Sequence, residues 1–265
     1  MKCSISRLKL FKACRRAYYL KYIEGLEPVQ KSEALEIGTN YHELIEGLYN
    51  IGSLPPAEDD WSKELAMAKA YEKYIYSQFK VKSVEEWAEG IVGKHILIGR
   101  VDGIAEDGSL VEHKTTSLNL DEYEFNLQWD EQMLAYMWLT DTTHIWYTMI
   151  RKPTIRQKKD ESEEEFFQRM INWYNEDTDS KIRVVKLERT RDQIADCIKE
   201  LWWIMDDIES LDTQDISRWS KNTCYCNHWG RRCEYANICL NYDPNQEYVE
   251  FVRGEENEQS MYTFN

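Results

Sequence analysis

The sequence contains no apolar run long enough for a helix to cross a bilayer, and its N-terminus lacks the apolar segment of a secretory signal peptide. These absences predict a protein with no membrane association and a cytoplasmic location. Basic residues are also few, because 33 Lys and Arg stand against 48 Asp and Glu, and the net charge is −15. Binding to nucleic acid depends on cations that neutralise phosphates, so any such binding must use local clusters of cations or metal ions.

The chain has 265 residues and is rich in Trp and Tyr, which is enough for one domain, or one domain with an appendage, around its own core. Hydrophobic periodicity predicts helices over residues 4–24 (two short segments), 33–50 (with Leu35 in its buried stripe), 60–80, 127–139, 166–174 and 190–209. It predicts strands over 84–91, 143–151 and 182–188, and loops over 25–32 and in the acidic stretch after residue 117.

The central feature of the sequence is residues 96–117, where two apolar runs flank Asp107-Gly108, a strong hairpin signal. Charged side chains interrupt these runs at Asp102, Glu112 and Lys114. Side chains alternate between the faces of a strand, so Glu112 and Lys114 must share a face. Burying such groups is costly unless they are paired, bound to a metal or solvated in a cleft.

The register of this hairpin decides whether the charges form a site. A two-residue turn would place Asp102 opposite His113, whereas a three-residue connection or a bulge would place it opposite Lys114. We predict the second arrangement, which brings Asp102, Glu112 and Lys114 to one face. Two carboxylates there could bind a hard divalent cation, and the ammonium could orient a water molecule. These groups are typical of metal-assisted phosphodiester hydrolysis.

The segments Gly99-Arg100-Val101-Asp102 and Glu112-His113-Lys114-Thr115-Thr116 resemble the Asp…Glu-x-Lys core of the PD-(D/E)XK nucleases. The resemblance is closest to the RecB-like branch, which includes AddB-type helicase–nucleases and the iron–sulfur nucleases of CRISPR systems. Two further segments match in the same order. Gly38–His42 resembles the family's Gly-x-x-x-His segment, and Gln132–Tyr136 resembles its Gln-x-x-x-Tyr segment. Taken alone, a helical His is more often structural.

This resemblance implies an α/β fold of the restriction-endonuclease type, in which helices flank a mixed sheet built on the 96–115 hairpin. It also implies roles for individual residues. Asp102, Glu112, His42 and the backbone carbonyl of His113 would hold one or two Mg²⁺ or Mn²⁺ ions. Lys114 would orient the attacking water, and two further side chains would shape the site around the scissile strand, namely Gln132 and Tyr136.

Seven cysteines in a cytosolic chain indicate metal or cluster ligation rather than disulfides. Spacing alone leaves zinc and iron–sulfur open, because Cys224, Cys226, Cys233 and Cys239 could form a local zinc site, with His228 as a further ligand. The resemblance to the iron–sulfur nucleases implies a 4Fe-4S cluster in a lobe formed by both chain ends, with ligands Cys14, Cys226, Cys233 and Cys239. Cys224 remains an alternative to Cys226.

We therefore predict three regions: an N-terminal helical segment (1–30), a nuclease core (31–210) and a cysteine-rich segment with a tail (211–265). The predicted function is a metal-dependent deoxyribonuclease of DNA repair or recombination, an exonuclease on single-stranded or frayed DNA ends, possessing a structural 4Fe-4S cluster and able to work with a helicase. The alternative is a non-catalytic, cluster-stabilised subunit of a helicase–nuclease or another DNA-processing complex. Net acidity favours the alternative, and the intact Asp, Glu and Lys set opposes it.

Overall fold

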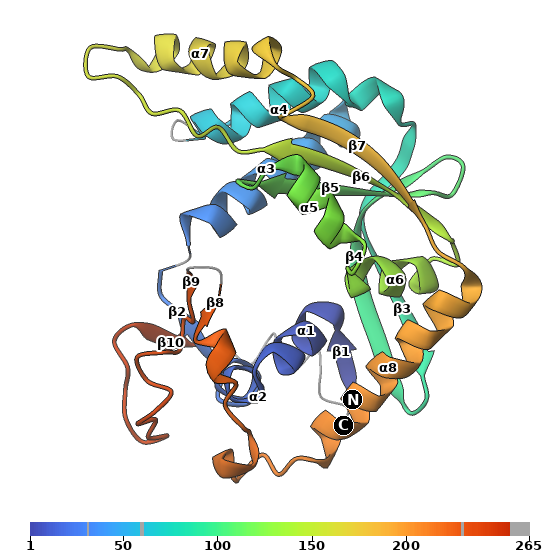
Figure 1. Ribbon diagram of the computed structural model, residues 1–265, viewed down its shortest axis with the longest axis vertical. Coiled ribbons are helices and arrows are strands. Elements are labelled where there is room, and N and C mark those ends of the chain that lie inside the picture. The colour runs from blue at the N-terminus through green and yellow to red at the C-terminus, as the bar shows by residue number, and fades with distance from the viewer. Residues whose placement is uncertain (31, 59–60, 229–230, 255–265) are drawn as a thin grey trace. The chain divides into compact units, whose positions relative to one another are not determined.

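The computed structural model describes residues 1–30, 32–58, 61–228 and 231–254 (Figure 1). The chain divides into two compact units. The central unit comprises the described residues of Ser32–Ala88 and Arg100–Ile194. The terminal unit comprises those of Met1–Lys31, Glu89–Gly99 and Ala195–Asn265. Both chain ends therefore contribute to one unit, and the strand hairpin that precedes the predicted site runs through both units.

The central unit contains a mixed β-sheet. Strand β5 (Leu110–Thr116) pairs antiparallel with β4 (His95–Ala105) and parallel with β6 (His144–Arg151). Strand β6 pairs antiparallel with β7 (Ile182–Glu188), and β3 (Val81–Val92) pairs with β4. Most side chains of β5 and β6 are buried, as expected for central strands that are covered on both faces.

Helices cover both faces of this sheet (Figure 1). Helices α3 (Glu33–Ile51), α4 (Ser62–Tyr74) and α7 (Glu163–Glu176) pack on one side, where the ring of His113 contacts Tyr49 and Tyr71. Helices α5 (Leu120–Leu127) and α6 (Glu131–Leu139) lie on the other side, where Glu112 contacts Gln132. The predicted mixed sheet flanked by helices is thus confirmed.

The terminal unit contains short elements around one long helix. Strand β1 (Lys2–Ser4) pairs parallel with the start of β4, and α1 (Ile5–Ala13), α2 (Arg15–Tyr18) and a π-helical turn (Tyr19–Ile23) follow. Most of α8 (Arg191–Ser210) belongs to this unit. Two small ribbons complete it: β2 (Leu26–Pro28) with β10 (Phe251–Arg253), and β8 (Asn227–His228) with β9 (Arg231–Arg232).

No helix in the described ranges has the length and the apolar character that crossing a membrane requires.

Trp219 holds the N-terminal helices of the terminal unit to a segment about 200 residues away. Its ring is fully buried, stacks on Tyr18 with centroids 5.7 Å apart, and meets the edge of Phe11 at 6.2 Å. The Arg16 guanidinium donates hydrogen bonds of 3.0 Å to the carbonyl oxygens of Trp219 and Ile216. Aromatic packing of this kind stabilises the unit through buried area and ring geometry.

Several local predictions were wrong. The acidic stretch after residue 117 contains helix α5, because Asn119 caps it by accepting a hydrogen bond from Asp121 N–H and acids favour a first helical turn. The loop over 25–32 contains β2, whose partner β10 lies too far along the chain for local periodicity to reveal. Leu35 is exposed, and α6 begins only at Glu131 because Asp130 caps it.

The hairpin register differs from the predicted one by two residues. The connection does have three residues, because the Ala105 N–H donates to the Ser109 carbonyl, and Gly108, the last of the three, has φ +83°. The ladder pairs Ile104 with Leu110 and Gly103 with Val111, so the next residues along are Asp102 and Glu112 rather than Asp102 and Lys114. A two-residue shift preserves the face of every side chain, and the three charged groups therefore stay together.

We expect Trp219→Ala to lower the free energy of unfolding by about 3–5 kcal/mol, because it removes a fully buried indole. Denaturant titration of the full chain measures this loss. Trp129→Ala is the matched control, since that side chain is 75% exposed, and its effect should stay within about 0.5 kcal/mol. Equal effects of the two substitutions would contradict the packing role of Trp219.

Candidate active site

Asp102 lies where the backbone ladder between β4 and β5 ends. Its Oδ2 accepts a 2.8 Å hydrogen bond from the backbone N–H of His113, which fixes the carboxylate between the two strands. Its Oδ1 lies 3.6 Å from Nδ1 of His42, which helix α3 carries near its midpoint. The Asp102 side chain is 11% exposed, so the carboxylate is largely shielded from solvent.

Glu112 and Lys114 point from β5 toward α6. Lys114 Nζ lies 2.5 Å from Oε1 of Glu112, and the same oxygen accepts a 3.4 Å hydrogen bond from the Gln132 amide. Gln132 in turn donates to the Tyr136 hydroxyl at 2.9 Å. The two side chains share a face of α6, as their four-residue spacing predicts. The Glu112 side chain is 3% exposed and the Lys114 side chain is 20% exposed. The contacts among these four residues offset the cost of burying the two charges.

The charges of these groups act on one another strongly. Burial and the neighbouring charge of Asp102 raise the pKa of Glu112 to about 7, although Lys114 opposes the shift. Burial would also raise the pKa of Asp102, but the charges of His42 and Lys114 outweigh it, and the pKa is lowered. Burial alone would lower the pKa of Lys114, but Glu112 and Asp102 raise it above its usual value. Lys114 therefore stays an ammonium.

A residue that the sequence analysis missed also reaches this site. Glu85 of β3 places Oε1 4.0 Å from Nδ1 of His42, and its Oε2 lies 2.6 Å from Nε of Arg100. One donor atom each from His42, Glu85 and Asp102 lie within 4.8 Å of one another. The Glu85-Glu86 pair inside a predicted strand was the only available signal, and it does not identify which acid faces inward.

The ring of His113 does not face the other site residues on β5. It packs against Tyr49 and Tyr71, and its Nδ1 lies 2.8 Å from the Thr148 hydroxyl. Burial lowers the pKa of His113 to about 3, so the ring is neutral. The predicted role of this residue was through its backbone carbonyl and not its ring, and that role remains a prediction.

The predicted cluster cysteines gather in the terminal unit. Cys14 lies buried between α1 and α2, where the Asn222 N–H donates to its Sγ at 3.4 Å. Burial raises the pKa of the thiols of Cys233 and Cys239, and the charges of Cys14 and Cys226 raise it further. The Cys233 N–H also donates to the carbonyl of Cys226 at 2.9 Å. Cys224 is exposed, and Cys197 is buried in α8. The side chain of His228 lies outside the described residues.

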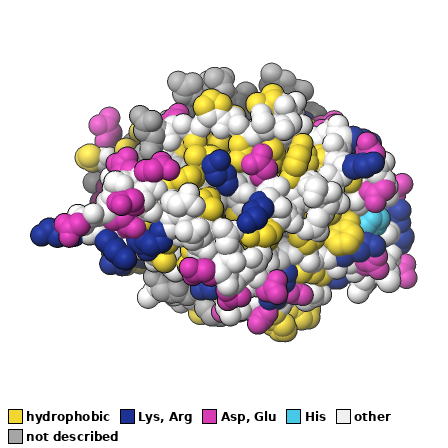
Figure 2. All heavy atoms as spheres, turned by 90° about the horizontal axis from the view of Figure 1, so that it is seen from above, with side chains coloured by type: hydrophobic (Ala, Val, Ile, Leu, Met, Phe, Trp, Pro, Cys, Tyr) yellow, Lys and Arg dark blue, Asp and Glu magenta, His cyan; other side chains and the backbone are white. Residues whose placement is uncertain are grey.

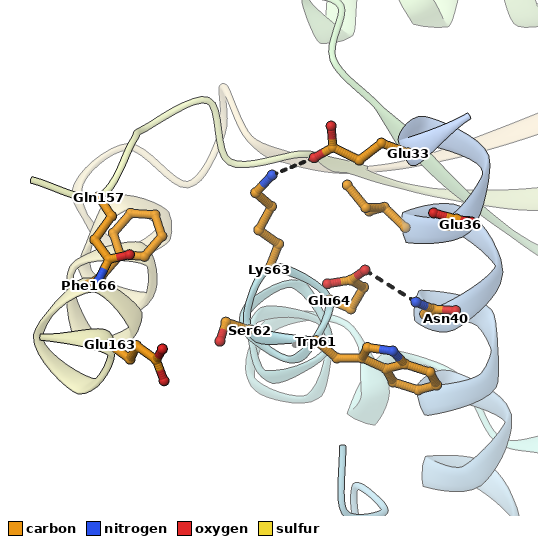
Figure 3. Close-up of a pocket in the computed structure, with 11 residues that line it drawn as sticks. Glu33, Glu36, Asn40, Trp61, Ser62, Lys63, Glu64, Gln157, Glu163 and Phe166 are labelled. Carbon is orange, nitrogen blue, oxygen red and sulfur yellow. Dashed lines mark hydrogen bonds and ion pairs between the residues drawn. The ribbon is translucent and has the colours of Figure 1, made fainter. Parts of the chain in front are cut away.

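A separate cavity of about 370 Å³ lies beside helices α3, α4 and α7 (Figure 3). Lys63 pairs with Glu33 at 2.8 Å, and the Asn40 amide donates to Glu64 at 3.4 Å. None of the predicted site residues lines it, and four of its lining side chains are glutamates, namely Glu33, Glu36, Glu64 and Glu163. Such a lining repels phosphate, so this cavity is not the candidate active site.

Comparison with known proteins agrees with this geometry. The family model of the PD-(D/E)XK nuclease superfamily matches residues 2–240, and the chain belongs to this superfamily. Among solved structures, the "putative exonuclease" of Eubacterium rectale is 12% identical and covers 93% of this chain and 90% of its own, with a TM-score of 0.56. A phage-related exonuclease of Haemophilus somnus is 17% identical, with coverages of 77% and 95% and a TM-score of 0.39. No curated protein sequence matches the chain.

The pKa directions predict how metal affinity depends on pH. Burial would lower the pKa of His42, but Asp102 and Glu112 outweigh it and raise the pKa, so His42 and Glu112 both retain protons at unusually high pH. A metal must displace these protons. The apparent affinity for Mn²⁺ should therefore rise about tenfold per pH unit for each proton displaced, and level off once both groups are deprotonated.

Isothermal titration calorimetry between about pH 5 and 8.5 measures this slope as a change in the dissociation constant. Glu112→Gln should flatten the profile, because it removes one of the two protons. His144→Ala should leave the profile unchanged, since that half-buried imidazole lies at the start of β6 and is not one of the grouped ligands His42, Glu85 and Asp102. A pH-independent affinity for the unmodified protein would contradict the prediction.

Proposed function

We propose that this protein is a metal-dependent deoxyribonuclease of the RecB-like branch, with a structural 4Fe-4S cluster. The observation that carries the proposal is the convergence of Asp102, Glu112 and Lys114 on one site, with the ammonium in direct contact with a buried carboxylate. A scaffold has no need of two nearby carboxylates, whose mutual repulsion raises the pKa of Glu112. A phosphodiesterase needs both.

The donors at this site fit a hard divalent cation. Asp102, Glu112 and the carbonyl of His113 would offer oxygen, which Mg²⁺ prefers, and His42 would offer nitrogen, which also admits Mn²⁺. When bound, such an ion supplies Lewis acidity toward the phosphate and lowers the pKa of a bound water. The spacing of His42 and Asp102, at 3.6 Å, is compatible with a shared ion.

The protein's own side chains position the reactants. Lys114, with its raised pKa, donates hydrogen bonds and does not accept a proton, so its role is to orient the attacking water and to offset charge on the phosphate. Glu112 fixes the ammonium, and Gln132 fixes Glu112 while contacting Tyr136. These contacts restrict the rotamers of all four side chains, which is how such sites gain rate by positioning.

Single-stranded or frayed DNA ends are the proposed substrate, cut as an exonuclease. The structurally similar Eubacterium rectale protein is named as a putative exonuclease. Phe125 at the end of α5 and Trp129 just before α6 both expose their rings near Gln132 in sequence. Exposed rings next to a nuclease site can stack on unpaired bases and need little positive charge to do so, which suits this acidic chain.

The cysteine arrangement supports the cluster. The four proposed ligands, Cys14, Cys226, Cys233 and Cys239, all belong to the terminal unit. The Asn222 N–H donates to Sγ of Cys14, and the Cys233 N–H donates to the carbonyl of Cys226, so the early cysteine lies against the segment that leads into the later ones. The cluster would join residues far apart in sequence and so stabilise the terminal unit.

Removing either charge should abolish cleavage. We expect Asp102→Ala or Lys114→Ala to reduce the rate by at least about 100- to 1,000-fold, because each removes transition-state stabilisation that water cannot replace. Degradation of end-labelled single-stranded DNA in Mn²⁺ measures the rate, and circular dichroism shows that the fold persists. Lys82→Ala, at an exposed site on β3, is the control and should retain full activity. A fully active Lys114→Ala protein would refute the site.

Anaerobically purified protein should be brown and contain about four iron atoms per chain. Cys14→Ser and Cys226→Ser should lose iron and visible absorbance, because each removes a ligand. Cys224→Ser and Cys197→Ser are the matched controls and should retain both. Colourless protein that contains zinc instead of iron would contradict the cluster.

The surface charge favours a second candidate, a non-catalytic subunit of a helicase–nuclease. The net charge is −15, and among the described residues on the face in Figure 2 acidic and basic side chains are intermingled. Such a surface suits a protein partner better than duplex DNA. Absence of any metal-dependent cleavage by intact, iron-loaded protein would favour this candidate.

A further inference from the structure

We propose that Glu85 is a metal ligand, which together with His42 and Asp102 holds a divalent cation in the central unit. This inference rests on the proposed function, because it assigns another residue to the same metal-dependent site. The inference goes beyond the proposed function, because the resemblance to the RecB-like nucleases gives no role to a residue on the strand before the hairpin. The three ligands come from three separate elements, which are α3, β3 and β4.

The spacing of the three donors fits shared ligation rather than hydrogen bonding. Nδ1 of His42 lies 3.6 Å from Asp102 and 4.0 Å from Glu85, and both distances exceed that of an ordinary hydrogen bond. Ligands at about 2.1 Å from a six-coordinate ion are about 3.0 Å apart when adjacent and about 4.2 Å apart when opposite. The observed distances fall within this range, so one ion could contact all three with small side-chain movements.

The backbone at Glu85 is strained, which a purely structural acid would not require. Its φ is +53°, a left-handed value in the interior of a strand, and only one other non-glycine residue in the described chain has a positive φ. Such strain persists where the surroundings enforce it and concentrates at functional sites. It also breaks the alternation of β3, because Glu85 is largely buried whereas Glu86 and Trp87 are both exposed.

Arg100 leaves one oxygen of Glu85 available. The guanidinium Nε lies 2.6 Å from Oε2, and Oε1 faces His42. The Glu85 side chain is 14% and the Asp102 side chain 11% exposed. Holding two carboxylates close together at such low solvent exposure is costly unless a cation lies between them. Arg100 thus orients the carboxylate toward the cation position, and Asp102 completes that position from the opposite strand.

The test is titration of the full, EDTA-treated chain with Mn²⁺, followed by calorimetry and by the shift of the melting temperature. Glu85→Gln should weaken Mn²⁺ binding at least tenfold and reduce the metal-induced rise in melting temperature. Glu85→Gly should weaken binding equally, yet melt at or above the temperature of Glu85→Gln without metal, because glycine adopts a positive φ without strain. Glu86→Gln, at the neighbouring exposed acid, is the control and should bind as the unmodified protein does.

If Glu85 serves only to pair with Arg100, Glu85→Gln will lower the metal-free melting temperature and leave Mn²⁺ affinity within twofold, which overturns the inference. Asp102→Ala distinguishes that result from failure of the proposed function. Loss of Mn²⁺ binding in Asp102→Ala, with unchanged binding in Glu85→Gln, would overturn the role of Glu85 alone. Unchanged binding in both variants would overturn the metal site itself.

Discussion

Two opposite charges inside an apolar strand are the constraint on which the rest of the structure depends. Glu112 and Lys114 sit among buried residues of β5, where neither could remain charged alone. Their mutual contact, together with the Gln132 amide, offsets part of that cost. Helix α6 must therefore present Gln132 to the sheet, and its N-cap Asp130 is held in turn by the Tyr147 hydroxyl of β6. The buried pair of Glu112 and Lys114 thus accounts both for the site and for the way α6 packs on the sheet.

The alternation of β5 carries the same constraint to the other face. His113 lies between the two charged residues and points away from them, so its neutral ring joins the aromatic cluster of Tyr49 and Tyr71. This contact holds α3 against the sheet, and α3 carries His42 to Asp102 at the edge of the hairpin. One short strand therefore organises both helical layers. The hydrogen bond from the His113 N–H to Asp102 joins the two sets of groups.

Features that depend on local periodicity could be predicted from the sequence. The hairpin register and the inward direction of Glu85 could not, because they depend on the three-dimensional path of the backbone. The shared face of Glu112 and Lys114 follows from strand geometry alone, whereas the mixed sheet flanked by helices was implied by the resemblance to the nuclease family. The pairing register between β4 and β5 could not be predicted in this way, because it depends on the turn that Ala105 and Ser109 close. Glu85 was missed because its inward direction results from a left-handed φ that no pattern of residue types encodes for glutamate.

The charges at the site also explain how so acidic a chain can accept a phosphate under the proposed function. Three carboxylates, from Glu85, Asp102 and Glu112, face two permanent cations, Lys114 and Arg100. With these groups ionised and His42 neutral, the site has one net negative charge and repels a phosphodiester. A single divalent ion reverses that sign. Metal binding must then precede productive DNA binding, and the attraction that most nucleases obtain from a basic surface would here come from the ion itself.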